Sequence, residues 1–303
     1  MNKKQILFSA LFLTFACASA GAAPPEPSAL EAICPPSEGK AFHSGWISLG
    51  LKAADLKEKQ VSAGHITDVG EAQVLLHFPA GWRPQDRRTA LCIFPGGGYS
   101  IQAIEKEGSR IAGWAAEHGM VGVVVKYRVS GTSNALGKFP GPLLDARQAL
   151  RTVRENASSL GIDPLRIGVM GFSAGGHLAA CWQAHPVADA VLAISGIYEL
   201  EPLLSTAVNR LLQLTPAEVN DLSPLRHLAE KISPLTLFYG TAERTELIAQ
   251  SENYAQRLRQ RGRPVDVIAL PGANHYTILD ALFATDGALF SQLYHDENPL
   301  CET

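Results

Sequence analysis

The sequence predicts an α/β fold built on a mostly parallel, twisted sheet flanked by helices. From about residue 70, short apolar segments alternate with longer segments of helical spacing, the pattern of strands joined by right-handed helical crossovers. Residues 121–127 form a nearly continuous run of β-branched side chains, typical of a strand buried on both faces. The 303 residues are 46% hydrophobic and 18% charged, which is enough apolar material for one large domain.

The elements follow one another in a regular order. Short apolar runs predict the strands, and apolar residues that recur every three or four positions predict the helices. The expected strands are 74–78, 89–94, 121–127, 167–171, 190–195, 235–240 and 265–270. The expected helices are 105–118, 143–160, 174–184 and 245–261, with a last helical stretch after His275.

One segment, residues 198–232, interrupts this alternation. It fits no single helix and contains Pro216 and Pro224. An insert at this point of an α/β sheet usually shapes a ligand pocket, so we interpret the segment as a small cap over the site. The alternative is a long surface excursion.

The N-terminus has the pattern of a secretory signal. Lys3 and Lys4 precede a short apolar stretch over 6–15, and small residues follow over 16–23. We expect cleavage after Ala20 or Ala23 and therefore an exported protein, periplasmic or secreted. The alternatives are an anchor that stays uncleaved and lipidation at Cys17.

The expected organisation is a signal peptide over 1–23, an N-terminal arm or linker over 24–65 and one α/β domain over 66–303. The arm is predicted because residues 24–40 are rich in Pro, Ser, Glu and Ala and have no apolar period. The mature form is expected to have no membrane span. The net charge of −3 and the lack of long basic runs argue against nucleic acid as a partner.

Five cysteines are present, and Cys17 would leave with the signal. Cys34 and Cys301 lie near the two ends of the mature chain and are candidates for a disulfide in an exported protein. Cys92 and Cys181 fall in a strand and a helix and are expected to be buried thiols. No cysteine or histidine spacing of a metal site occurs, so no metal is expected.

The motif with the clearest chemistry is G-x-S-x-G at residues 171–175, with Ser173 at its centre. It lies between an expected strand and an Ala-rich helix, the context of a nucleophile elbow. The turn is so tight that only small residues fit two positions either side of the serine. An ordinary glycine-rich turn is the alternative, but the strand-to-helix context favours a catalytic serine.

A nucleophilic serine needs a base and an acid that orients the base. His275 follows the last expected strand and is the candidate base, because ligands bind at the carboxyl edge of such sheets. His177, four residues past Ser173, is interpreted as structural. Glu243 follows the strand 235–240 and is the first candidate for the acid. Glu246 is the alternative, although it also fits the first turn of a helix.

The oxyanion formed during acyl transfer needs backbone N–H donors. The loop after the strand 89–94 contains consecutive glycines, which let a backbone approach a substrate closely. We predict Gly97, Gly98 and Ala174, the residue after the nucleophile, as the oxyanion hole. A phosphate loop is set aside because no G-K-[ST] sequence follows.

Together these residues resemble an α/β-hydrolase of the esterase type over about residues 70–285. The stretches 95–100, 144–164 and 171–179 resemble bacterial feruloyl and acetylxylan esterases, which hydrolyse carboxylic esters through an acyl-serine intermediate and need no cofactor. In the wider family the oxyanion loop usually begins with His, whereas this chain has Pro95. The segments 240–243 and 271–275 are similar to bacterial kynurenine formamidase-like hydrolases, in which the acid falls at the position of Glu243.

The function expected from the sequence is an exported serine hydrolase that cleaves carboxylic esters with a Ser173–His275–Glu243 triad. Its partner would be a small-molecule ester, such as a sugar or aryl ester, and no cofactor or metal is expected. An arylformamidase-type amide hydrolase is the second hypothesis. A non-catalytic binding module on the same fold is the third, and it is disfavoured because the chain keeps every triad position and both elbow glycines.

Overall fold

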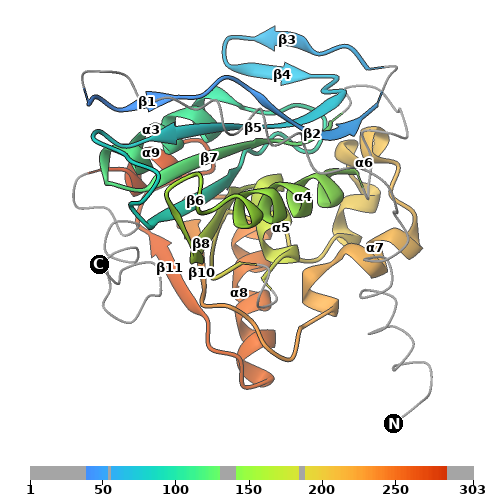
Figure 1. The fold of residues 1–303 in the computed structure, drawn as a ribbon. Coiled ribbons are helices and arrows are strands. Elements are labelled where there is room, and N and C mark those ends of the chain that lie inside the picture. Colours follow the sequence, from blue (N-terminus) through green and yellow to red (C-terminus); the bar gives the residue numbers. More distant parts are fainter. Residues whose placement is uncertain (1–38, 54–55, 130–140, 184–187, 285–303) are drawn as a thin grey trace, which may run out of the picture.

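A nine-stranded sheet runs through the molecule (Figure 1). The computed structural model describes residues 39–53, 56–129, 141–183 and 188–284. The order across the sheet is β1-β5-β7-β6-β8-β9-β10-β11, and β2 also pairs with β5. The strands of this sheet are β1 (Phe42–His43), β2 (Ile47–Lys52), β5 (Glu71–Phe78), β6 (Arg88–Phe94), β7 (Val121–Lys126), β8 (Ile162–Phe172), β9 (Ala190–Ile194), β10 (Leu235–Gly240) and β11 (Asp266–Leu270).

The six strands from β7 to β11 in this order pair in parallel, as expected for strands joined by helices. Their carboxyl ends therefore lie at one edge of the sheet. All residues of β7 and β10 are buried, which explains their continuous apolar runs. The predicted mostly parallel α/β sheet is confirmed.

The other end of the sheet is antiparallel and begins earlier in the chain than expected. β5 pairs antiparallel with β7, and both β1 and β2 pair antiparallel with β5. Residues 42–52, which the sequence placed in an arm, thus contribute to the main sheet. The side chains of Ile47 and Leu49 in β2 are buried. Their apolar alternation is confined to a six-residue strand among polar neighbours, which was too short to predict a strand. A separate hairpin is formed by β3 (Lys59–Ser62) and β4 (His65–Thr67).

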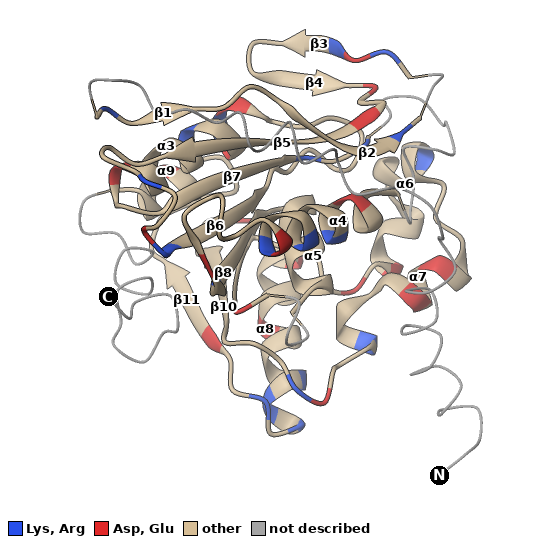
Figure 2. Cartoon of the chain, viewed as in Figure 1, with Lys and Arg blue, Asp and Glu red and all other residues tan. Residues whose placement is uncertain are grey.

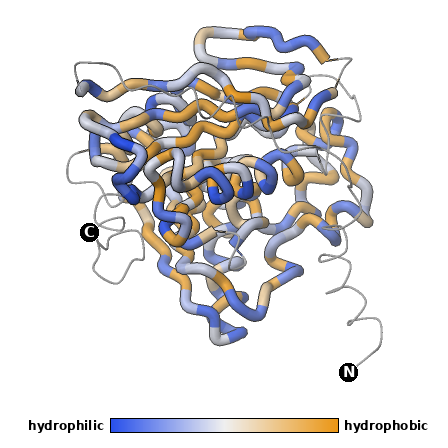
Figure 3. The backbone as a smooth tube through the Cα atoms, viewed as in Figure 1, coloured by the Kyte–Doolittle hydropathy of each residue, from blue (hydrophilic) through white to orange (hydrophobic). Residues whose placement is uncertain are grey.

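Helices cover both faces of the sheet and create two apolar cores (Figures 1 and 3). α4 (Gly141–Glu155), α5 (Ala174–Cys181) and α8 (Thr245–Gln260) bury apolar side chains in the larger core. α3 (Arg110–Glu117) and α9 (Ile278–Leu282) do so in the smaller core on the opposite face. Figure 3 shows the hydrophobic colour concentrated along the strands between these layers.

Helix boundaries differ from the expected ones where turns replace helix ends. The helix expected over 143–160 ends at Glu155, because the chain turns through Gly161, which has φ 62°, to enter β8. α5 ends at Cys181, and residues 184–187 lie outside the described residues. The helix expected over 105–118 begins with five residues of π-helix, η1 (Glu105–Ser109), before α3.

The insert over residues 198–232 contains four short helices. These are η3 (Glu201–Ser205), α6 (Ala207–Leu212), α7 (Pro216–Leu222) and η4 (Pro224–Arg226). Thr215 and Glu218 form a reciprocal capping box at the start of α7, with Pro216 at the first helical position. This sequence of caps and prolines explains why the insert has no single helical period.

Charges of both signs are interspersed over the helices and loops in the view of Figure 2, while the central strands carry few. Within the described ranges, no helix combines the length and the apolar character that a bilayer span requires. The expected signal peptide and the candidate disulfide Cys34–Cys301 lie outside the described residues.

Candidate active site

Ser173 lies at the sharp turn between β8 and α5 and has φ 55° and ψ −115°. A positive φ is strained for a residue with a side chain and is typical of functional sites. A Cβ on Gly171 would lie 2.0 Å from the carbonyl oxygen of Gly175, and one on Gly175 would lie 1.9 Å from that of Phe94. The two glycines that flank the serine therefore leave no room for a side chain, as the motif predicts.

Glu243 and His275 are brought together by the loops that follow β10 and β11. Nδ1 of His275 lies 3.3 Å from Oε2 of Glu243. The other carboxylate oxygen of Glu243 accepts hydrogen bonds from the Ser195 hydroxyl at 2.5 Å and from the Gly240 N–H at 3.0 Å. Burial raises the pKa of Glu243, but the hydrogen bonds from His275, Ser195 and Gly240 outweigh it, so the net pKa lies below its ordinary value.

The two loops are also joined through their backbones. The N–H of Ala242 donates to the carbonyl of Ala273 at 2.9 Å, and the N–H of Gly272 donates to the Thr241 hydroxyl at 2.9 Å. This coupling fixes the acid relative to the base. Glu246, the alternative acid, is exposed in the first turn of α8 and lies 3.5 Å from Arg244.

The imidazole of His275 packs against the residue that precedes Ser173. Its ring centroid lies 4.8 Å from that of Phe172, the residue directly before Ser173. In the described part of the chain, the Ser173 hydroxyl and His275 make no hydrogen bond with each other. The side chain of His275 is 24% exposed and reaches solvent, whereas that of Glu243 is fully covered.

The glycine loop after β6 is held through its carbonyls and through Gly96. Gly97 has φ 130° and Gly98 has φ 60°. The carbonyl of Gly97 accepts from the N–H groups of Ser100 and Ile101 at 3.2 and 3.1 Å. Within the described ranges, the N–H groups of Gly97 and Gly98 donate to no other group, which leaves them available to a ligand. Ala174 begins α5, where the first N–H groups have no partner within the helix.

His177 lies in the interior behind this loop, as the structural interpretation expects. It is fully buried, with Nδ1 2.6 Å from the Tyr99 hydroxyl and Nε2 2.8 Å from the carbonyl of Leu222. Burial lowers the pKa of His177 to about 4 despite the Leu222 hydrogen bond, so the ring is neutral near pH 7. His177 thereby connects the elbow helix to the insert.

Two contributors to this site, Ser195 and Glu107, were not expected from the sequence, and a third, Tyr99, was expected only to shape the pocket. Ser195, at the end of β9, has φ 48° and binds the acid. Tyr99 is buried and its hydroxyl lies 2.8 Å from the carbonyl of Ala174. Glu107 accepts the N–H of Gly96. The only local signals were the position of Ser195 at a strand end and that of Tyr99 directly after the glycine loop, whereas nothing local marked Glu107.

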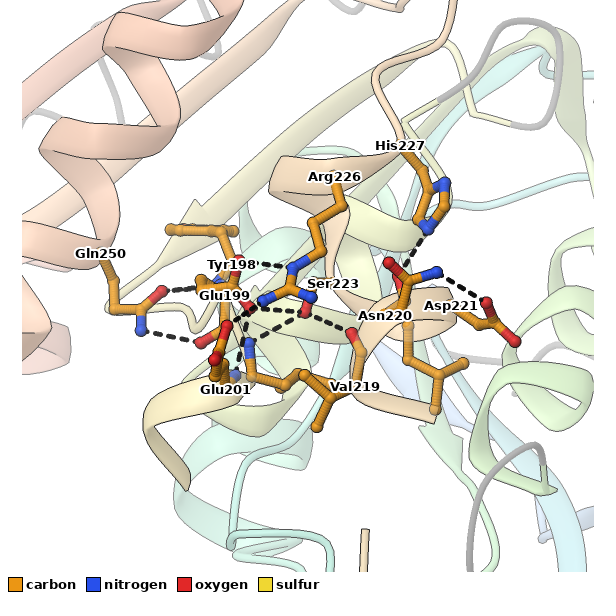
Figure 4. A network of polar contacts seen from close by, with 12 residues as sticks. Tyr198, Glu199, Glu201, Val219, Asn220, Asp221, Ser223, Arg226, His227 and Gln250 are labelled. Carbon is orange, nitrogen blue, oxygen red and sulfur yellow. Dashed lines mark hydrogen bonds and ion pairs between the residues drawn. The ribbon is translucent and has the colours of Figure 1, made fainter. Parts of the chain in front are cut away.

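Side chains of the insert and of α8 form a polar network beside the site (Figure 4). Oε1 of Gln250 accepts the N–H groups of Tyr198 and Glu199, both at 2.8 Å, and its Nε2 donates to the Glu199 carbonyl at 3.0 Å. Arg226 bridges Glu199 and Glu201, which raises the Arg226 pKa through both hydrogen bonds. Over the described residues, no group of three or more His, Cys, Asp or Glu is placed to hold a metal ion.

The fold and this arrangement define an α/β-hydrolase. The chain is similar to several esterases and to kynurenine formamidases, and esterase structures share its fold. Residues 82–185 match the BD-FAE family. The chain is 31% identical to an acetylxylan esterase of Xylanibacter ruminicola over 166 residues, covering 55% of this chain and 30% of that enzyme. It is 28% identical to a kynurenine formamidase of Danio rerio, covering 63% of this chain and 67% of that enzyme.

A solved structure gives the same result. The acetyl ester-xyloside bifunctional hydrolase from Caldicellulosiruptor lactoaceticus superposes with a TM-score of 0.64 at 26% identity, covering 79% of this chain and 90% of that one. The first curated esterases that the chain matches are longer, since it spans between 30% and 57% of their length. These similarities confirm the esterase-type resemblance seen in the sequence.

Proposed function

We propose that the protein hydrolyses carboxylic esters through an acyl-serine intermediate, with Ser173 as nucleophile, His275 as base and Glu243 as the acid that orients it. The observation that carries the proposal is the Glu243–His275 pair, whose imidazole packs on Phe172 directly beside Ser173. Because Glu243 binds Nδ1, the other ring nitrogen, Nε2, is left to handle the proton of the serine.

The proposed reaction has two halves. Nε2 of His275 takes the proton of Ser173 as Oγ attacks the ester carbonyl, and the N–H groups of Gly97, Gly98 and Ala174 bind the resulting oxyanion. The imidazolium then protonates the leaving alcohol, which departs and leaves the acyl-serine. Water, activated by the same imidazole, attacks the acyl carbon, and the acid product leaves with Ser173 restored.

The electrostatics of Glu243 support this assignment. Its lowered pKa keeps the carboxylate ionised near neutral pH, and an ionised acid stabilises the imidazolium that forms on each proton transfer. Substrate binding has to bring Oγ and Nε2 within hydrogen-bond reach, since such bonds often tighten only when the substrate is bound. The N–H groups of Gly97 and Gly98 have no hydrogen-bond partner among the described residues, so they can bind the oxyanion without first breaking a hydrogen bond.

The test is hydrolysis of p-nitrophenyl acetate, butyrate and octanoate by the mature protein and by Ser173→Ala, His275→Ala and Glu243→Gln. We expect the first two changes to lower kcat by at least about 10⁴-fold and Glu243→Gln by about 10²- to 10⁴-fold. Glu246→Gln is the matched control and is expected to retain the rate. Wild-type rates in Ser173→Ala or His275→Ala would overturn the proposal, and an effect of Glu246→Gln instead of Glu243→Gln would reassign the acid.

Aryl formamide hydrolysis is the second candidate, because the chain is similar to kynurenine formamidases over about two thirds of each sequence. Ser173-dependent turnover of N-formylkynurenine without turnover of the p-nitrophenyl esters would favour it. A binding module on this fold would keep its ligand affinity in Ser173→Ala and show no Ser173-dependent turnover of either substrate.

We also propose that the enzyme acts after export on a small ester such as a sugar or aryl ester. The basic, apolar and small-residue pattern of residues 1–23 supports export. The similarity to an acetylxylan esterase supports a sugar ester as substrate. Mass determination of the purified mature chain separates cleavage after Ala20 or Ala23 from retention or from a lipid on Cys17, and acetylated xylo-oligosaccharides test the substrate class.

A further inference from the structure

The glycine loop is held by a side chain that the proposed reaction does not use. Oε2 of Glu107 accepts the N–H of Gly96 at 2.8 Å. A Cβ on Gly96 would lie 2.8 Å from that same oxygen, 3.1 Å from the Cβ of Ser173 and 2.7 Å from the carbonyl oxygen of Phe172. Gly96 is therefore sandwiched between the carboxyl group of Glu107 and the backbone of the nucleophile elbow.

The remaining polar groups of the loop are tied in a way that leaves two donors open. The Gly96 carbonyl accepts the N–H of Ala103 at 3.2 Å, and the Pro95 carbonyl accepts the Tyr127 hydroxyl. The N–H groups of Gly97 and Gly98 point to no partner among the described residues. Glu107 thus accepts the hydrogen bond of the Gly96 N–H, which directly precedes the two candidate oxyanion donors.

Glu107 belongs to the π-helical turn η1, and the same turn also holds the loop of the base. Lys106 donates from Nζ to the carbonyl of Tyr276, next to His275, at 2.8 Å. The N–H of Glu107 donates to Ala103, closing the connection to Gly96. Single π-helical turns are rare and occur often at functional sites. Here the turn connects the glycine loop on one side to the His275 loop on the other.

The surroundings of Glu107 act on the pKa of its carboxyl group in opposite directions. Burial raises the pKa of Glu107 and outweighs the opposite effects of the Gly96 hydrogen bond and of the nearby His275, His65 and Lys106 side chains. The hydrogen bond from Gly96 does not depend on the proton, since a carboxyl group accepts in either state.

We propose that Glu107 is a positioning residue of the reaction, which holds Gly96 so that the N–H groups of Gly97 and Gly98 face the oxyanion. This inference rests on the proposed function. Glu107 touches no reacting atom in this proposal and acts through the loop alone. Its loss should therefore weaken binding of the transition state and leave binding of the ground-state ester unchanged.

The experiment compares Glu107→Ala, Glu107→Gln and Glu107→Asp in the full mature chain, with p-nitrophenyl acetate as substrate. Ala removes the acceptor, and Asp keeps the charge but is one methylene too short to reach Gly96. Gln keeps an acceptor oxygen of the same length without the charge. We expect Ala and Asp to lower kcat by about 10- to 100-fold with KM within about threefold, and Gln to stay within a few-fold of wild type.

A second readout separates positioning from general structural damage. A trifluoromethyl ketone forms an adduct with the serine that carries an oxyanion, so its inhibition constant should rise in Glu107→Ala by the same factor as kcat/KM falls. Glu105→Ala, an exposed neighbour in the same turn, is the control and should retain the wild-type rate and inhibition constant. If Glu107→Ala does not fold, the contrast between Glu107→Gln and Glu107→Asp still decides.

The outcomes keep this inference separate from the proposed function. If wild-type turnover does not depend on Ser173, the proposed function fails first. If turnover depends on Ser173 but Glu107→Ala and Glu107→Asp keep the wild-type kcat, the positioning role is wrong. A KM effect alone would place the contribution of Glu107 in ground-state binding, and a loss in Glu107→Gln with the wild-type rate kept in Glu107→Asp would make the carboxylate charge the decisive property; either result would overturn the role given to the loop.

Discussion

Two regions that adjoin the site are fixed in different ways. The loops at the strand ends of β6, β8, β10 and β11 include backbones that approach one another so closely that no side chain fits between them. The insert over residues 198–232 is fixed by polar side chains, with Gln250 holding Tyr198 and Glu199 and with Arg226 bridging two glutamates (Figure 4). Close backbone contacts leave no room for a displacement of the chain, whereas side-chain hydrogen bonds can be replaced by hydrogen bonds to water.

This difference separates the positioning of reacting groups from the shaping of a pocket. A displacement of about 1 Å at reacting atoms costs about 10²-fold in rate, so backbone contacts without slack suit the triad. A pocket that accepts a substrate tolerates more movement, and hydrogen bonds of about 1 kcal/mol each are sufficient to hold it. Changes at the strand ends should therefore have larger effects than changes in the insert.

The largest effect is expected for Gly175→Ala. Its Cβ would lie 1.9 Å from the carbonyl oxygen of Phe94, so α5 and β6 have to separate and Ser173 moves with them. We expect a loss of about 4 kcal/mol or more in unfolding free energy, together with loss of turnover. Urea unfolding and p-nitrophenyl acetate hydrolysis measure the two effects.

Gly113→Ala is the control for that variant, because a Cβ at this helical position of α3 meets nothing within 4 Å. It should keep full activity and gain up to about 1 kcal/mol from the better helix former. Near-wild-type stability in Gly175→Ala would contradict the conclusion that the elbow has no room for a side chain at this position.

The next effect concerns His177, which joins the two regions through Leu222. Its pKa is lowered from 6.5 to about 4 in the folded protein, so the unfolded chain binds a proton more readily between these values. The unfolding free energy should therefore be complete above pH 6.5 and fall by about 3 kcal/mol as the pH drops to 4.

Unfolding in urea at pH 7 and pH 4 measures this loss in wild type and in His177→Gln. Burial also lowers the pKa of His77 to about 4, so the wild-type slope contains both groups and the difference between the two proteins isolates His177. An equal loss of unfolding free energy in both proteins would show that His177 does not titrate as its burial requires.

The same division decides what the sequence could predict. The parallel sheet and the positions of Ser173, Glu243 and His275 follow from local patterns, because each residue lies at or in the loop after the carboxyl end of a strand, and these ends meet at one edge. The sequence also favoured Glu243 over Glu246, and the structure places the former against His275.

The rest depends on contacts between distant segments that leave no local pattern. Ser195 is an ordinary serine until the sheet places it 2.5 Å from Glu243. Glu107 is one of three glutamates in the helical stretch expected over 105–118, and the π-helical turn directs it to Gly96. β1 and β2 belong to the sheet because both pair with β5. Ile47, for example, pairs with Val74, which is more than 20 residues away along the chain.

The smallest effect is expected in the insert, for Gln250→Ala. This change removes the acceptor of the Tyr198 and Glu199 N–H groups and the donor to the Glu199 carbonyl. Because water can reach this half-buried position, we expect a loss of about 2 kcal/mol in unfolding free energy and a kcat for p-nitrophenyl acetate within about threefold of wild type. Gln256→Ala, exposed on the same helix, should stay within about 0.5 kcal/mol. A loss of kcat as large as that of a triad variant would mean that the insert positions the reacting groups as well, and the two regions would then form a single unit.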